Sequence, residues 1–144
     1  MSEDPSKPAV TLSDRQGLPI AGEPLVELAA RTLESEGAAD AELSVSLVEP
    51  EEMAALHQRY LGEAGPTDVL SFPQDGDAPP GERRLLGDVV ICPAVAVRQG
   101  DLSSELRLLV VHGILHLLGY DHEEEEDRRR MWSRQEAYSG VRVP

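Results

Sequence analysis

The sequence predicts an α+β fold: one small mixed sheet of about four strands, packed with helices, one of which is central and carries a metal. Three observations predict it. Ala41–Val48 alternates apolar and polar side chains, as a half-buried strand does. Other segments carry apolar residues at helical spacing, and the elements follow in the order β-α-β-α-β-β-α-α-α. The apolar run Leu106–Leu118 contains two histidines and marks the central helix.

Turn residues and periodicity set the element boundaries. Strands are expected at Ala9–Leu12, Ala41–Val48, Asp68–Phe72 and Leu85–Cys92, the last two as an antiparallel pair joined by an exposed loop over Gln74–Arg84. Helices are expected at Glu23–Glu36, Pro50–Gly62 and Pro93–Gly100, then over the histidine run with Ser103 or Ser104 as its N-cap, and finally to about Tyr138. Inward-facing side chains are expected at Met53, Leu56 and Tyr60, and at Met131, Trp132 and Tyr138.

Length, charge and cysteine usage limit the functional class. With 144 residues, the chain is expected to form a single metal-dependent hydrolase domain over residues 9–144 after a disordered tail at residues 1–8. A net charge of −14 argues against coating nucleic acid by bulk electrostatics, but a local basic groove is still allowed. The lone Cys92 is expected to be a small buried residue. No secretory or membrane-spanning segment is predicted, so we expect a cytoplasmic protein without a membrane partner.

Three histidines at defined spacing carry the chemistry. His112 and His116 stand four residues apart, so both project from one face of a helix. Gly119 follows, where a helix C-terminus favours glycine, and lets the chain bring His122 back toward the pair. Three imidazoles leave an open position on zinc, which is typical of a catalytic site and predicts hydrolysis. Another late divalent metal would also accept these ligands.

Simpler interpretations of these residues stay open. A single histidine on an apolar helix is more often a hydrogen-bonded core or surface residue, and His57 is interpreted in that way, as a surface or rim residue. Asp121 is either a carboxylate that supports one of the ligating histidines or the cap of the last helix. The acidic run that follows is interpreted as a solvated helix start, and Arg128–Arg130 mostly as partners of those acids.

The histidine spacing also matches the zinc-protease pattern H-E-x-x-H-x-x-G-x-x-H at every position but one. The second position is Gly113 here, where the protease pattern has the glutamate that acts as general base. This difference counts against peptide hydrolysis. A zinc metalloprotease-like hydrolase is nevertheless kept as an alternative, as is a non-catalytic, metal-stabilised ribosome-assembly factor.

Three blocks together resemble the YbeY family of bacterial metal-dependent endoribonucleases. They are H-G-I-L-H-L-L-G-Y-D-H (residues 112–122), G-P-T-D-V-L-S-F-P (residues 65–73) and L-G-D-V-V-I (residues 86–91). The resemblance covers residues 9–139. It implies a single-strand-specific endoribonuclease with one zinc ion on His112, His116 and His122. It further implies action on single-stranded rRNA in 16S rRNA 3′-end maturation and ribosome quality control, together with the small ribosomal subunit and its proteins, and no role on DNA.

Phosphodiester cleavage also calls for a cation near the metal. In many relatives an arginine precedes the glycine before the P-T-D block, whereas this chain has Leu61 there. Arg59 is the nearest arginine and is the predicted catalytic or phosphate-binding residue. Two positions apart on a helix, the two side chains would point about 200° apart, so Arg59 is a simple replacement only if the helix has already ended. Further candidates for a basic strip or for the cleft lining are Arg83, Arg84, Arg98, Arg107, Ser71 and Asp68.

Overall fold

The computed structural model describes residues 6–74, 81–120 and 124–142. Its elements occur in the predicted order. They are β1 (Ala9–Arg15), α1 (Glu23–Ser35), β2 (Ala41–Val48), α2 (Pro50–Leu61), β3 (Val69–Pro73), β4 (Arg84–Ile91), α3 (Pro93–Ala96), α4 (Leu102–Leu117) and α5 (Glu125–Ser139). The predicted tail at residues 1–8 falls largely outside the described residues.

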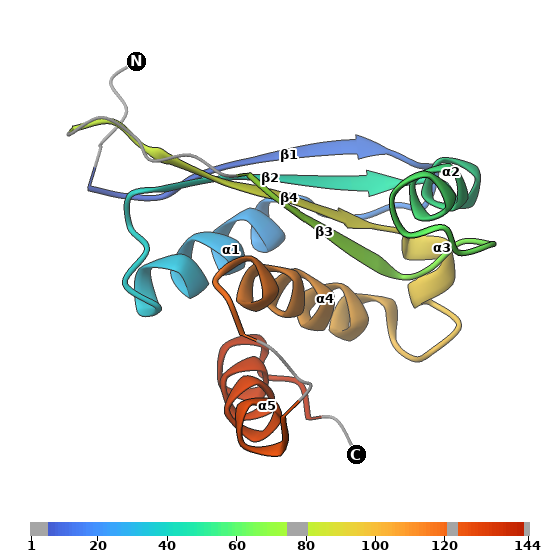
Figure 1. Ribbon diagram of the computed structural model, residues 1–144. Helices are drawn as coiled ribbons and strands as arrows, with labels where there is room; N and C mark the ends of the chain where they lie inside the picture. The colour runs from blue at the N-terminus through green and yellow to red at the C-terminus, as the bar shows by residue number, and fades with distance from the viewer. Residues whose placement is uncertain (1–5, 75–80, 121–123, 143–144) are drawn as a thin grey trace.

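The four strands form one mixed sheet in the order β1-β2-β4-β3 (Figure 1). β1, β2 and β4 are parallel, and β3 pairs antiparallel to β4, as the turn chemistry between the two predicts. β3 is therefore an edge strand of the sheet. The predicted α+β class with a single four-stranded mixed sheet is confirmed.

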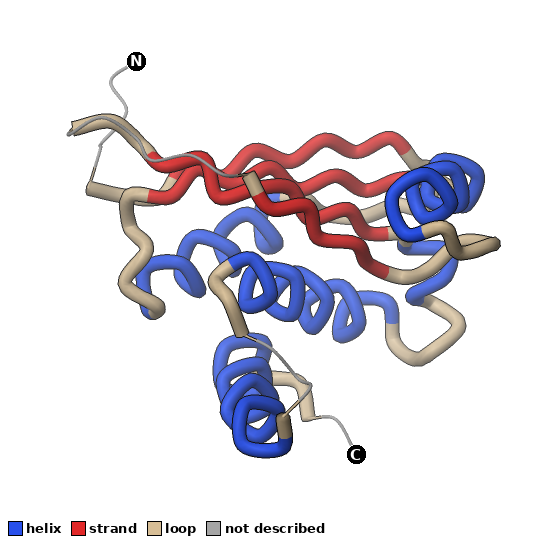
Figure 2. The backbone as a smooth tube through the Cα atoms, viewed as in Figure 1, coloured by secondary structure: helices blue, strands red, loops and turns tan. Residues whose placement is uncertain are grey.

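The helices lie mainly on one side of the sheet and build two further layers. α1 and α4 run side by side beneath the strands, and α5 packs against the far side of α4 (Figure 2). The alternation of β2 turns its apolar side chains toward these helices, where Leu43, Val45 and Leu47 are buried. They join the main core with Val110 and Ile114 of α4. α4 is thus the central helix, held between the sheet and α5.

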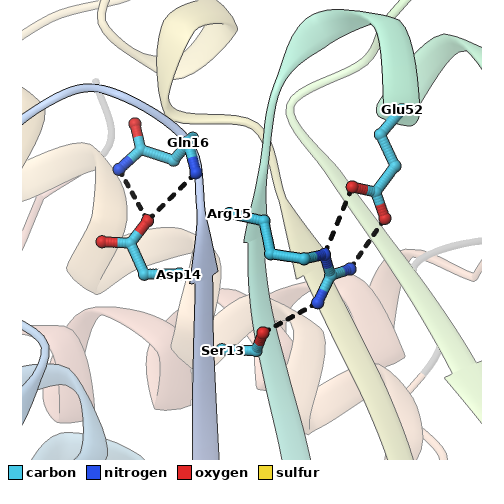
Figure 3. Close-up of polar contacts among 5 residues, drawn as sticks. All are labelled: Ser13, Asp14, Arg15, Gln16 and Glu52. Carbon is cyan, nitrogen blue, oxygen red and sulfur yellow. Dashed lines mark hydrogen bonds and ion pairs between the residues drawn. The ribbon is translucent and has the colours of Figure 1, made fainter.

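α2 lies at the end of the sheet toward which β1 and β2 run (Figure 1). It covers a smaller core in which Met53 and Cys92 are fully buried, so the prediction of a buried rather than reactive cysteine is confirmed. Burial raises the pKa of the Cys92 thiol. Arg15 at the end of β1 holds α2 through a two-pronged contact with Glu52, with Nη2 and Oε2 2.7 Å apart (Figure 3).

Several local predictions are wrong. Tyr60 and Trp132 are both 55% exposed rather than inward, because the described elements leave more than half of each residue uncovered. Asp101, not Ser103 or Ser104, caps α4: its carboxylate accepts from the Ser104 backbone N–H at 3.1 Å. β1 extends beyond Leu12 to Arg15 because it pairs with β2 along its whole length, and α3 ends at Ala96, before Gly100.

Other local predictions are confirmed. α5 begins with Glu125, Glu126 and Asp127 in its first turn, the solvated acidic start that the sequence predicts. Arg129 pairs with Glu125 one turn earlier. Met131 is buried and Tyr138 docks part of its side chain, so both help to attach α5, whereas Trp132 is 55% exposed. Within the described residues, no helix is long and apolar enough to cross a membrane.

Candidate metal centre and its cleft

The two helical histidines lie at a cleft between α4 and the edge strand β3. The rings of His112 and His116 stand edge to face with centroids 4.5 Å apart, as expected for residues one helical turn apart. The cleft has a volume of about 450 Å³, a size typical of ligand pockets. It is lined by Leu61, Val69, Leu70, Ser71, Pro73, His112, His116 and Leu117.

Two glycines allow α4 to approach the sheet this closely. A Cβ atom on Gly113 would lie 2.6 Å from Val89 Cγ1, closer than packed atoms approach, and 3.3 Å from Ser71 Oγ, a tight contact. Gly87, with φ +149°, faces the end of α4: its Cβ would lie 2.4 Å from the Phe72 carbonyl oxygen and 3.0 Å from Leu117 Cδ2. Ser71 also donates to the Gly113 carbonyl at 3.4 Å. The short distance between α4 and the β3–β4 pair therefore depends on both glycines.

α4 ends directly beyond the second histidine. Leu118 is its C-cap, and Gly119 has φ +99°, a conformation that favours glycine. The Gly119 and Tyr120 N–H groups close the helix by donating to the carbonyls of His116 and Leu115. The predicted helix stop at this glycine is confirmed.

His112 is held from the outer layer by Gln135 of α5. The amide Oε1 of Gln135 lies 2.7 Å from His112 Nδ1, and the glutamine side chain is buried, with 5% of the residue exposed. Because an amide oxygen only accepts, a neutral His112 that hydrogen-bonds to Oε1 does so through an Nδ1–H group and has its lone pair on Nε2. Ligating histidines generally have such an acceptor behind them. Gln135 was not predicted, although Met131, Gln135 and Ser139 form a buried stripe at i, i+4 and i+8 that places a polar residue on the apolar face.

His122 and Asp121 lie outside the described residues. Among residues 6–74, 81–120 and 124–142, no three side chains of metal-binding type gather into one site, since only two of the three predicted ligands fall in those ranges. The two that are described suit a zinc ion: both are imidazoles, both are half-buried at one cleft, and His112 is oriented through its other nitrogen.

Comparison with known proteins identifies the family. The family model described as endoribonuclease YbeY matches residues 16–140. The chain belongs to the YbeY family. The endoribonuclease YbeY of Thermobifida fusca (strain YX) is 48% identical over 138 residues, which cover 88% of this chain and 89% of that relative. The one from Frankia casuarinae is 58% identical over 105 residues, 64% of this chain and 52% of the relative, so the match spans about half of that protein.

A solved structure supports the same fold. The solution structure of TM1509 from Thermotoga maritima superimposes with a TM-score of 0.59 at 30% identity, covering 92% of this chain and 86% of that one. The fold described above is therefore shared with that protein.

In this YbeY-family chain, the surroundings of Gly113 count against the protease alternative on steric grounds as well as chemical ones. Residue 113 faces Val89 and Ser71 in the packed interface with the sheet. A glutamate there would have its Cβ 2.6 Å from Val89 Cγ1, well inside the van der Waals contact distance, and would add a carboxylate to a buried position. The position cannot carry the general base of the zinc-protease pattern while α4 keeps this place.

The cleft wall carries Leu61, and Arg59 stands two positions earlier on the same helix. α2 continues through Leu61, so Arg59 and Leu61 leave the helix in different directions. Leu61 lines the cleft, whereas the Arg59 guanidinium lies 5.4 Å from the ring centroid of exposed Tyr60. Tyr60 in turn contacts Phe72 edge to face. Arg59 thus lies beside the cleft rim rather than in its lining, and its catalytic role stays a prediction.

The remaining predicted polar residues divide between the cleft and structural contacts. Ser71 lines the cleft as predicted, whereas Asp68 accepts from Gln99 and Thr67. Three of the four strip arginines have structural partners: Arg83 bonds the Lys7 carbonyl, Arg84 pairs with Asp40, and Arg107 bonds the Ser139 carbonyl. These contacts favour their structural interpretation.

His57 is buried, which corrects its prediction as a surface or rim residue. Only 9% of it is exposed, because α2 packs it beneath the loop that follows. Its Nδ1 faces the Gly65 carbonyl at 2.9 Å and its Nε2 faces Glu63 Oε2 at 2.9 Å. His57 therefore anchors the turn between α2 and the block at residues 65–73.

Glu36 is a second residue that the sequence did not indicate. Its side chain, 8% exposed, accepts from Tyr120 at 2.6 Å, from Tyr138 and from Arg134 at 3.3 Å. Burial and hydrogen bonding to this carboxylate raise the pKa of both tyrosines. The cluster ties the turn after α4 and the helix α5 to the end of α1, and thereby holds Gln135 next to His112.

Proposed function

We propose that this chain is a zinc-dependent, single-strand-specific endoribonuclease that acts in 16S rRNA 3′-end maturation and ribosome quality control. One observation carries the proposal: a chain of the YbeY family, whose named relatives are endoribonucleases, places His112 and His116 side by side at a cleft. The proposed substrate is single-stranded rRNA, and the proposed site of action is the cytoplasm.

In this proposal His112, His116 and His122 hold one zinc ion, or another late divalent metal. When bound, such an ion supplies an activated water near neutral pH and positive charge for the phosphate. The chain's own residues do the rest. Gln135 orients His112, and the close packing at Gly113 sets the distance between the histidines and the β3 wall of the cleft.

The charge of the protein bears on how the substrate reaches this cleft. A net charge of −14 opposes tight binding of free RNA, since phosphate contacts dominate such affinity. Among the described residues, those that line the cleft, Leu61 included, contain no arginine or lysine. We therefore propose that the small ribosomal subunit and its proteins present the rRNA, rather than the enzyme capturing it alone.

The test compares the wild-type protein with His116→Ala on single-stranded RNA, double-stranded RNA, DNA and peptide substrates. The wild type is expected to cleave single-stranded RNA only, and the variant is expected to lose both stoichiometric zinc and cleavage while keeping its circular dichroism spectrum. A His116→Ala protein that cleaves like the wild type would contradict the proposal.

A chelator separates catalysis from a purely structural metal. The proposal expects chelation to stop cleavage with little change in the folded structure and zinc to restore it. Unfolding on chelation, with no cleavage at any stage, would instead favour the metal-stabilised assembly factor, and peptide cleavage would favour the protease-like alternative.

A further inference from the structure

We propose that Gln135 is a positioning residue for the metal centre: it holds His112 as the Nδ1–H tautomer, so that Nε2 is the ligating nitrogen. The inference rests on the zinc site of the proposed function and adds a residue from a different helix, 23 positions further along the chain. Gln135 does not itself touch metal or substrate in this proposal; it acts through His112.

The geometry of the contact supports this role. Gln135 Oε1 and His112 Nδ1 are 2.7 Å apart, a short distance for a hydrogen bond between neutral groups. In a neutral imidazole, one nitrogen carries the proton and the other the lone pair. An acceptor behind Nδ1 therefore selects the tautomer whose lone pair is on Nε2 and also fixes the orientation of the ring.

The surroundings of Gln135 make the contact costly to lose. The residue is 5% exposed and lies one turn from Met131, whose cluster contains Leu28, Val111 and Leu115. A buried amide in such surroundings destabilises the fold unless its polar atoms are bonded. Methionine would fill a similar volume without that cost. The hydrogen bond to His112 offsets the free-energy cost of burying the amide, which accounts for a glutamine at this position.

The attachment of α5 fixes the position of the amide. Ser139, one turn beyond, donates to the Gln135 carbonyl at 2.6 Å, and Arg107 of α4 donates to the Ser139 carbonyl at 2.9 Å. Glu36 holds Tyr138 and Arg134 on the same helix. α5 is therefore tied to both α1 and α4, so the Gln135 side chain reaches His112 from a fixed support.

The experiment uses the full chain in two variants. Gln135→Met removes the acceptor and keeps the length of the side chain, whereas Gln135→Glu keeps an acceptor at the same place. Two quantities are measured: the ¹⁵N chemical shifts of the His112 ring nitrogens in the metal-free protein, which report the tautomer, and zinc affinity by competition with a chromophoric chelator. Neither depends on RNA cleavage.

Gln135→Met is expected to move His112 toward the Nε2–H tautomer and to weaken zinc binding about 10- to 100-fold, the usual effect of losing such a partner. Gln135→Glu is expected to keep the Nδ1–H tautomer and zinc affinity at the wild-type level or above. Ser139→Ala is the control: it removes a buried hydrogen bond from the same face of α5 and is expected to lower stability without changing the tautomer.

Two results would overturn the inference. One is a wild-type His112 that carries its proton on Nε2, which would mean that the Gln135 amide donates instead. The other is a folded Gln135→Met protein with wild-type tautomer and zinc affinity. If Gln135→Met does not fold, a tenfold loss of zinc affinity in Gln135→Glu overturns it equally. If the wild type binds no zinc, the proposed function fails, while the tautomer shift still decides whether Gln135 orients His112.

Discussion

Two histidines with contrasting surroundings show how the fold assigns roles to one residue type. His57, on α2, is 9% exposed and has an oxygen opposite each ring nitrogen: the Gly65 carbonyl and the Glu63 carboxylate. His112, on α4, has the Gln135 amide oxygen behind Nδ1, and its ring faces the cleft beside His116. Both ring nitrogens of His57 face oxygen atoms of the loop that follows α2, so His57 is structural, whereas an acceptor behind Nδ1 suits His112 to binding a metal through Nε2.

The difference lies in the partner and not in the histidine. His57 is bonded by residues six and eight positions further along its own segment, and it holds that loop. His112 is bonded by a residue of another helix layer. A short-range partner closes a turn, whereas a long-range partner on a buried helix sets the orientation of a side chain at a cleft.

The same substitution in both histidines should give the largest and most separable effects. His112→Asn is expected to lose stoichiometric zinc and at least 100-fold in cleavage rate while keeping its fold. His57→Asn is expected to keep its zinc but lose about 1–3 kcal/mol of unfolding free energy, because the loop loses buried hydrogen bonds. Metal analysis measures the bound zinc, and denaturant unfolding measures the unfolding free energy of both variants. Zinc loss in folded His57→Asn would break the comparison.

Gly113→Glu tests whether the protease residue can exist on this helix. The substitution is expected to destabilise the protein by more than about 3 kcal/mol, since the new Cβ overlaps Val89 and a carboxylate becomes buried. Gly113→Ala should cost less, and Val89→Ala should offset part of that cost in the double variant. Thermal unfolding gives these values. A Gly113→Glu protein as stable as wild type would show that α4 does not need this close contact.

Leu61→Arg tests whether a cation in the cleft wall would increase activity. We expect it to raise kcat/KM on single-stranded RNA about tenfold, equivalent to about 1.4 kcal/mol of transition-state stabilisation. Leu85→Arg is the matched control, because Leu85 is 52% exposed against 57% for Leu61 and lies on β4 outside the cleft lining. An equal gain in both variants would point to overall charge instead of a site at position 61.

Arg59→Ala addresses the predicted phosphate-binding residue. Because Arg59 lies over Tyr60 at the rim, we expect a two- to fivefold rise in KM with little change in kcat, roughly 0.5–1 kcal/mol. Arg128→Ala removes a comparable arginine, whose guanidinium lies 5.9 Å from the Trp132 ring centroid, and should leave KM unchanged. A large fall in kcat on Arg59→Ala would assign it a direct catalytic role.

Glu52→Gln should have the smallest effect. Its hydrogen bonds with Arg15 lower the pKa of the Glu52 carboxyl, so the pair stabilises the fold above the usual carboxyl range and loses that contribution as the pH falls through the lowered value. Both side chains are nearly half exposed, which limits the contribution to less than about 1 kcal/mol. Unfolding from pH 3 to 7 tests this, and zinc binding at pH 7 should not change.

Much of the fold could be predicted because it depends on patterns within short segments of the sequence. The alternation of Ala41–Val48 and the prolines at the starts of α1 and α2 gave nearly the observed boundaries. The helical spacing of His112 and His116 requires no knowledge of the rest of the molecule. The exposure of individual side chains was harder to predict. Tyr60 and Trp132 are large and apolar enough for a core, but whether another element covers them depends on the packing of the whole chain.

The sequence by itself determined the order of the elements, the facing pair of histidines and the glycine that ends their helix, because covalent spacing and backbone preference act over a few residues. Only the tertiary structure decided which side chain lies behind Nδ1 of His112, why residue 113 has no side chain, and why His57 contacts a loop. Each of these depends on a partner that packing brings close: Gln135 behind His112, Val89 beneath Gly113, and the Gly65 turn above α2.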